Sequence, residues 1–173
     1  MADNNAELTT LFLECSRHQF LEQSWPRLRQ CVESLTDEHI WHRPNPASNS
    51  IGNLILHLNG NVRQWLVTSF NHDEDHRNRP AEFSEIRVIP KAELLSTLAA
   101  TLEEARVVLE RLTTADLLAS YEIQGYNPTG LDVVYHVVEH FALHYGQIIY
   151  ITKMLTAQDL GFYSYLNKNG RAD

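Results

Sequence analysis

The sequence lacks any apolar run that could cross a lipid bilayer, which takes about 20 consecutive apolar residues. Its first residues, MADNNAELTT, have neither the basic nor the apolar region of a signal peptide. Basic residues are also few: 14 Lys and Arg against 22 Asp and Glu give a formal net charge of −8, whereas nucleic-acid binders display basic patches. We therefore expect a cytoplasmic protein that binds neither membranes nor nucleic acid.

Cysteine is scarce as well, which limits disulfide and thiolate chemistry. Cys15 and Cys31 fall in one expected helix, and at about 1.5 Å of rise per residue their Cα atoms lie about 24 Å apart, too far for a disulfide. The sequence contains no CxxC pair, so a zinc ribbon or a redox dithiol is excluded. We expect two buried thiols.

What is present predicts an all-α protein. With 173 residues, 43% of them hydrophobic and 21% charged, the chain is long enough for one domain, residues 1–173, with a full core. Apolar residues recur with helical spacing in four segments, which predicts a four-helix bundle. The expected helices cover residues 7–34, 50–70, 91–112 and 131–155.

The connections are expected to differ in length and kind. Pro26 kinks the first helix or divides it in two. Residues 71–90 are charged and bounded by proline, which predicts a long loop between the second and third helices, of the kind that often has a function such as a lid. Residues 113–120 suggest a helical turn and 121–130 an extended link, while the aromatic tail, 157–173, is expected to pack back on the bundle as a short helix or loop.

The last helix carries the clearest chemical pattern. It is apolar on nearly every side, as in a buried bundle helix, yet it contains His136, His140 and His144 at intervals of four. At 100° per residue these rings drift by only about 40° per step, so they form one stripe. Two histidines at i and i+4 can bind one metal ion, although a run of core histidines bonded to carbonyls or water has the same spacing.

The second helix carries a polar stripe of its own. His57 shares this stripe with Asn53, Gly60, Asn61 and Gln64, opposite the apolar arc. Taken alone, the stripe indicates a solvent-exposed face. Carboxamides around a histidine, with a glycine that leaves room for a ligand, are also typical of a polar cleft.

Four other histidines are interpreted as surface residues. His39 and His42 flank a capped turn, and His72 and His76 lie in a charged run that binds cations weakly at best.

Two motifs together, SIGNLILHLNGNVRQWL and EHFALHYGQIIYITKML, resemble the DinB/YfiT-like superfamily of metal-binding four-helix bundles over nearly the whole chain. By that resemblance His57, His140 and His144 are the ligands of one divalent metal ion, either zinc or nickel, and His136 lies one turn outside the triad. The resemblance also implies a homodimer, and a small-molecule substrate that in some members is a low-molecular-weight thiol such as bacillithiol or mycothiol. Many members have no assigned reaction.

Three histidine ligands with an open position are typical of a catalytic metal site, where the ion lowers the pKa of a bound water or thiol. We assign substrate orientation to Asn61 and Gln147 and proton relay to His136. A di-iron site is excluded because no glutamate has a histidine three residues on, and HExxH is excluded because Phe141, Ala142 and Leu143 separate the ligands. Two hypotheses remain: a metal-dependent thiol transferase or hydrolase, and a dimerising module in which the ion only braces the bundle.

Overall fold

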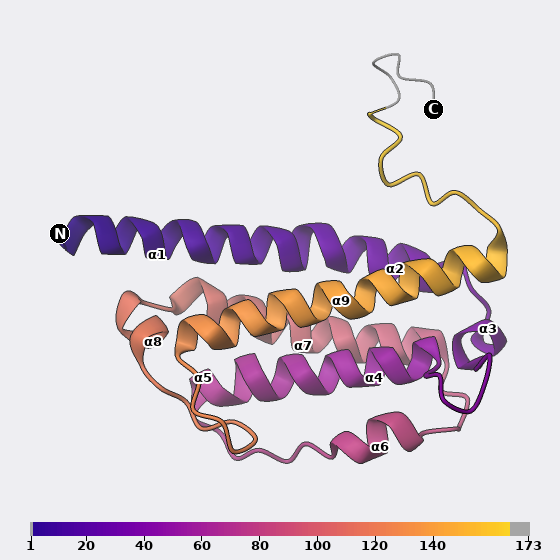
Figure 1. Cartoon of the computed structure of the whole chain (residues 1–173), viewed down its shortest axis with the longest axis horizontal. Helices are drawn as coiled ribbons and strands as arrows, with labels where there is room; N and C mark the ends of the chain where they lie inside the picture. The colour runs from indigo at the N-terminus through magenta and orange to yellow at the C-terminus, as the bar shows by residue number, and fades with distance from the viewer. Residues whose placement is uncertain (1, 167–173) are drawn as a thin grey trace.

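Four helical rods run side by side and form the body of the molecule (Figure 1). The computed structural model describes residues 2–166, with side chains from residue 4 onward. The elements in chain order are α1 (Ala2–Arg17), η1 (His18–Ser24), α2 (Trp25–Glu33), α3 (Asp37–Trp41), α4 (Ile51–Val62), η2 (Arg63–Thr68), α5 (Ser69–Asn71), α6 (Arg79–Ser84), α7 (Lys91–Arg111), α8 (Thr114–Leu118) and α9 (Gly130–Thr156). The rods are α1–η1–α2, α4–η2–α5, α7 and α9, so the predicted all-α four-helix bundle is confirmed.

The first rod passes Pro26 without breaking. A proline has no amide hydrogen and its ring clashes with the carbonyl four residues earlier, which interrupts an α-helix. Here the preceding turn, η1, is a π-helix, in which the Trp25 amide donates to the Phe20 carbonyl five residues back. The wider turn accommodates the proline, so the rod continues as α2 rather than dividing into two separate helices.

Hydrogen-bonded caps fix where the rods begin. Ser50 forms a capping box with Asn53 at the start of α4, and Thr129 forms one with Asp132 at the start of α9. Each box satisfies amide hydrogens that a helix start otherwise leaves unpaired, a contribution of about 1 kcal/mol. Both helices begin at the residue after the cap.

The core lies between the rods and includes the inner face of α9. Phe141 on α9 packs edge-on against Phe20 of the π turn, with ring centroids 4.8 Å apart. The prediction that α9 is buried all round was wrong, because its outer face exposes five large apolar residues. These are Leu131, Tyr135, Leu143, Tyr150 and Met154.

The connection between the second and third rods is not the plain loop that was predicted, because it contains α6, which lies along α4 (Figure 1). Asn78 caps α6 and Pro80 lies in its first turn, where a missing amide hydrogen costs nothing. The Asn53 side chain of α4 donates to the carbonyls of Glu82 and Glu85, at 2.9 and 3.0 Å. These bonds hold the connection against the bundle.

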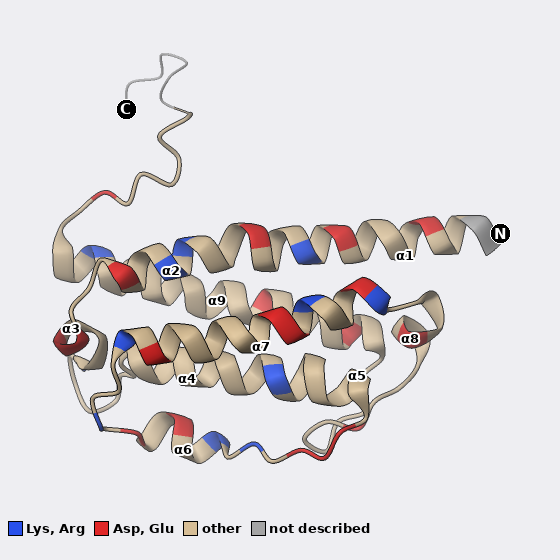
Figure 2. Cartoon of the chain, turned by 180° about the vertical axis from the view of Figure 1, so that it is seen from behind, with Lys and Arg blue, Asp and Glu red and all other residues tan. Residues whose placement is uncertain are grey.

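The remaining segments follow the bundle surface. Residues 120–129 form a short hairpin-like link closed by two isolated bridges, and Leu160 and Phe162 of the tail pack against the core. The rest of the predicted tail, residues 167–173, lies outside the described residues. Charged residues of both signs are interspersed along α1, α2 and α7 (Figure 2). Over residues 2–166, no helix has the length and apolarity that crossing a bilayer demands.

Candidate metal centre

His57 occupies the middle of α4 with both ring nitrogens engaged. Its side chain is buried, with the residue only 4% exposed. Nδ1 lies 2.8 Å from Oε2 of Glu82 on α6, and Nε2 lies 3.1 Å from Nε2 of His140 on α9. The polar stripe on α4 that alone suggested a solvent-exposed face is therefore buried, because α6 and α9 cover it.

The histidines of α9 form the other side of the centre. The rings of His136 and His140 have centroids 5.2 Å apart, and those of His140 and His144 are 4.5 Å apart, as expected for one stripe. Nδ1 of His144 lies 2.9 Å from the Gln147 amide oxygen. Because that oxygen only accepts, His144 donates from Nδ1 and keeps the lone pair of Nε2 free.

The three predicted ligands lie together. His57, His140 and His144 each offer one nitrogen, and these atoms lie within 4.8 Å of one another. A tetrahedral zinc ion with bonds of about 2.0–2.1 Å holds neighbouring ligand atoms about 3.3 Å apart, close to the 3.1 Å between the Nε2 atoms of His57 and His140. Two such nitrogens need a proton or a cation between them, so the donor set suits a metal ion.

Burial keeps His140 and His144 neutral. Burial, together with the neighbouring His144, His57 and His136, lowers the pKa of His140 to about 3. Burial also lowers the pKa of His144, while the hydrogen bond to Gln147 partly opposes this. Neutral imidazole is the form that binds a metal, so protons compete weakly for the site near neutral pH.

His136 stands one turn before the triad and stacks on Trp65, with centroids 4.0 Å apart. The Asn61 amide nitrogen lies 3.2 Å from Nε2 of His136, whereas its amide oxygen is buried without a hydrogen-bond partner in the described part of the chain. The structure thus brings Asn61 and His136 together beside the triad. Gln147 joins the triad through its hydrogen bond to His144.

Sequence reasoning missed a buried ion pair behind His57. The Arg77 guanidinium donates to both oxygens of Glu82, at 2.7 and 2.9 Å, and to the Gln64 side chain at 2.8 Å. Burial alone would raise the pKa of Glu82, but the hydrogen bonds from His57 and Arg77 outweigh it and lower that pKa. In the sequence, Gly60 on the polar stripe was the signal that another group approaches this face of α4. In the structure that group is the Glu82 carboxylate, which a Cβ at position 60 would meet.

The outlying histidines and cysteines lie largely as expected. His42, His72 and His76 are exposed, and His39 is half-buried rather than fully solvent-facing. Cys31 is buried, but the prediction that Cys15 is buried was wrong, because α1 turns this residue to solvent.

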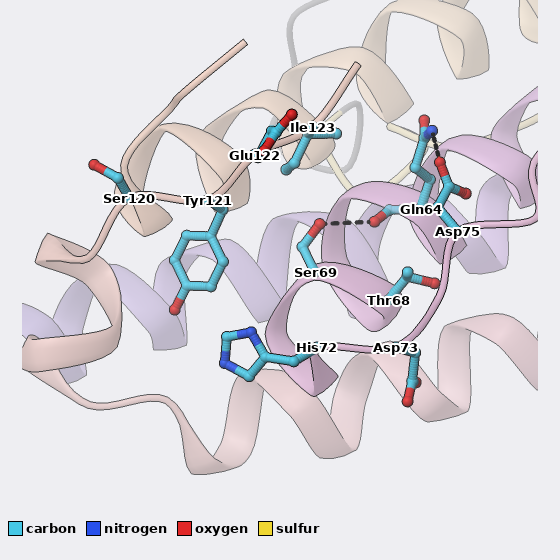
Figure 3. A pocket seen from close by; sticks show the side chains of 10 residues that line it. All are labelled: Gln64, Thr68, Ser69, His72, Asp73, Asp75, Ser120, Tyr121, Glu122 and Ile123. Atoms are coloured by element: carbon cyan, nitrogen blue, oxygen red, sulfur yellow. Dashed lines mark hydrogen bonds between the residues drawn. The ribbon is translucent and has the colours of Figure 1, made fainter. Parts of the chain in front are cut away.

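Two hollows open on the bundle surface. One of about 530 Å³ is lined by Gln147 and by other residues of α9 and of the loop before α4, including Leu143, Tyr150 and Ser48. Another of about 340 Å³ lies between the end of the second rod and the 120–123 link (Figure 3). There Gln64 bonds to Asp75, and none of the three triad histidines lines either hollow.

Comparisons with known proteins agree on the architecture. The model of a family described as a protein of unknown function (DUF1572) matches residues 7–168. A conserved protein from Enterococcus faecalis superposes with a TM-score of 0.67 at 16% identity, over 88% of this chain and 98% of that chain. A DinB-like protein from Bacillus cereus superposes with a TM-score of 0.62 at 12% identity, over 78% and 87%. No functionally curated protein matches.

Proposed function

The chain belongs to the DUF1572 family and has the DinB-like fold of the DinB/YfiT-like superfamily, and from that premise we propose that it is a metal-dependent enzyme. The observation that carries the proposal is the meeting of His57 from α4 with His140 and His144 from α9. These three residues would hold one divalent ion, zinc or nickel, both of which suit imidazole nitrogen. The bound ion would supply a Lewis acid that lowers the pKa of a water or thiol.

The surroundings support catalysis rather than a purely structural ion. Three protein ligands leave one position of a tetrahedral ion open, whereas structural zinc sites are closed by four. Gln147 lines the larger hollow, where we place the small-molecule substrate, and it bonds to a ligand histidine. We propose that Gln147 and Asn61 orient this substrate and that His136 relays a proton.

The substrate class proposed first is a low-molecular-weight thiol, which a transferase would join to an electrophile, and the second is a hydrolysable small molecule. A thiol added to the cobalt-substituted protein should change its visible spectrum, because sulfur would enter the coordination shell. If neither thiols, other small ligands nor a change of pH alters the visible spectrum of the cobalt protein, the alternative is supported. In that alternative the ion only stabilises the bundle and the protein catalyses no reaction.

The proposal of the metal site is tested by elemental analysis of the purified wild-type protein beside His140→Ala. We expect about one equivalent of a divalent transition metal in the wild type and a loss of most of it in the variant. Equal metal content in the two proteins would overturn the site. Leu8→Ala changes an exposed residue of α1 and is the control for metal lost during purification. This variant should retain its metal.

We further propose that the protein is a cytoplasmic homodimer. The two free cysteines suit a reducing compartment, and the exposed apolar residues on the outer face of α9 suit a second copy of this chain. Tyr150→Glu on this face should shift the mass measured by light scattering from dimer to monomer. A monomeric wild type would overturn the dimer.

A further inference from the structure

A carboxylate outside the four rods contacts one of the proposed ligands. Glu82 lies on α6, in the connection between the second and third rods, and its Oε2 atom is 2.8 Å from Nδ1 of His57. The side chains of both residues are largely buried, with 5% of His57 and 10% of Glu82 exposed. Because both side chains are buried, the contacts around them fix their relative position.

The charges around Nδ1 decide which tautomer His57 adopts. A carboxylate only accepts hydrogen bonds and a guanidinium only donates them. Nη2 of Arg77 also lies near Nδ1, at 3.2 Å, but the same nitrogen donates to Glu82 at 2.9 Å. With Glu82 in place, Nδ1 of His57 therefore carries the proton and donates it, and the Nε2 lone pair faces His140.

The bundle is shaped to keep this carboxylate in position. Gly60, one turn after His57, leaves the space that the Glu82 carboxylate occupies, since any Cβ at that position would lie closer than 3.0 Å to it. Arg43 also links α4 to α6, because its guanidinium donates to the Asn53 side chain at 2.7 Å and to the Phe83 carbonyl at 2.8 Å. Both helix α4 and the segment before it are thus fitted to α6.

We propose that Glu82 is a positioning residue for the metal centre, which fixes His57 in the tautomer that can bind an ion, and that Arg77 holds Glu82 for that task. The connection carrying α6 is then a working part of the site and not a spacer. This inference rests on the proposed three-histidine site. It assigns to Glu82 the part that carboxylates play behind metal-binding histidines in general, where their loss weakens metal affinity by about 10- to 100-fold.

The test is zinc affinity by competition with a chromophoric chelator, for the wild type, Glu82→Gln and Glu82→Ala. We expect both variants to bind zinc about 10- to 100-fold more weakly than the wild type. The matched control is Glu104→Gln, which removes a carboxylate of α7 that is paired with Arg63 of η2 at 2.7 Å on the half-exposed surface. This control should bind zinc as the wild type does.

A second measurement does not depend on any variant binding metal. Nitrogen-15 NMR of the metal-free protein reports which ring nitrogen of His57 carries the proton, with the signals assigned by their absence in His57→Gln. We expect the proton on Nδ1 in the wild type and on Nε2 in Glu82→Ala, because Arg77 would then donate to Nδ1.

The outcomes separate the two proposals. Wild-type protein that binds no zinc overturns the metal site itself, whereas wild-type binding with unchanged affinity in both Glu82 variants overturns only the role of Glu82. A proton on Nε2 of His57 in the wild type also overturns that role, even if the variants fail to fold.

Discussion

At the scale of single residues, Gly60 is the position where the helix is adapted to the site. A glycine inside an α-helix normally destabilises it by about 1 kcal/mol relative to alanine, so an alanine would be expected to help. The space beside Gly60 holds the Glu82 carboxylate and the Arg77 guanidinium, which a methyl group would displace. The glycine is therefore retained at the expense of helix stability.

We expect Gly60→Ala to lower zinc affinity by about tenfold, because it moves the carboxylate behind His57. The gain in helix propensity should offset the strain, so the melting temperature of the metal-free protein should change by only a few degrees. Gly146→Ala is the matched control for stability: nothing lies within 4 Å of its added Cβ, and it should stabilise α9 by about 0.5–1 kcal/mol. Unchanged zinc affinity in Gly60→Ala would contradict the prediction.

Cys31 provides a prediction about pH. Burial raises the pKa of this thiol to about 11, from an ordinary value near 9, although the hydrogen bond to Thr152 lowers it slightly. A folded-state pKa above the unfolded value means that the contribution to stability is complete below about pH 9. It is lost as the pH rises toward 11, because the unfolded chain then releases the proton more readily.

The two thiols should therefore react differently. At pH 8 a thiol reagent such as DTNB should label the exposed Cys15 quickly and Cys31 only after unfolding in guanidinium. In Cys15→Ser no fast phase should remain. Rapid labelling of two thiols in the folded wild type would show that Cys31 is accessible, against this prediction.

At the scale of elements, the sequence predicts the rods well because each is long and has a continuous apolar stripe. The caps at Ser50 and Thr129 could be read from residue type and position alone. The short helix α6 could not, since six residues carry too little periodicity to be distinguished from a loop. Asn78 followed by a proline two residues later was a helix-start signal, but the surrounding charges favoured a loop.

The residues of the candidate metal centre were predicted less evenly, for a physical reason. Helical spacing places His140 and His144 on one stripe, because they share a helix. His57 needed a resemblance to a known family, because spacing within α4 cannot show that α6 and α9 bury its polar stripe. Glu82 and Arg77 belong to a different element from His57, and the pairing of these three residues exists only once the chain has folded.

The inner face of α9 provides the test at this scale. Phe141 is 1% exposed and packs on Phe20, so Phe141→Ala removes a buried ring that the surrounding rods cannot replace. We expect this variant to lose about 3–5 kcal/mol of unfolding free energy in a guanidinium titration. Val107→Ala, on α7 and 53% exposed, should change stability by less than about 0.5 kcal/mol. Similar losses in both variants would mean that α9 is not packed as described.

At the scale of the whole molecule, the proposed ion links two rods that are far apart in sequence. An ion that binds the folded state and not the unfolded state stabilises the fold by about 2.7 kcal/mol at 100 times its dissociation constant. For a protein of 173 residues this should raise the melting temperature by about 5–10 °C. Calorimetry with added zinc and with EDTA measures the shift, and His140→Ala should abolish it. An identical melting temperature in zinc and EDTA would contradict a metal bridge between α4 and α9.

The position of α6 also matters for anyone who redesigns this bundle. A protein engineer who wished to idealise it would shorten the link between the second and third rods to a tight turn, since that segment adds little to the core. All three ligand histidines would survive the operation, and so would the overall shape. The shortened protein would nevertheless have lost Glu82, the group that we propose sets which ring nitrogen of His57 carries the proton.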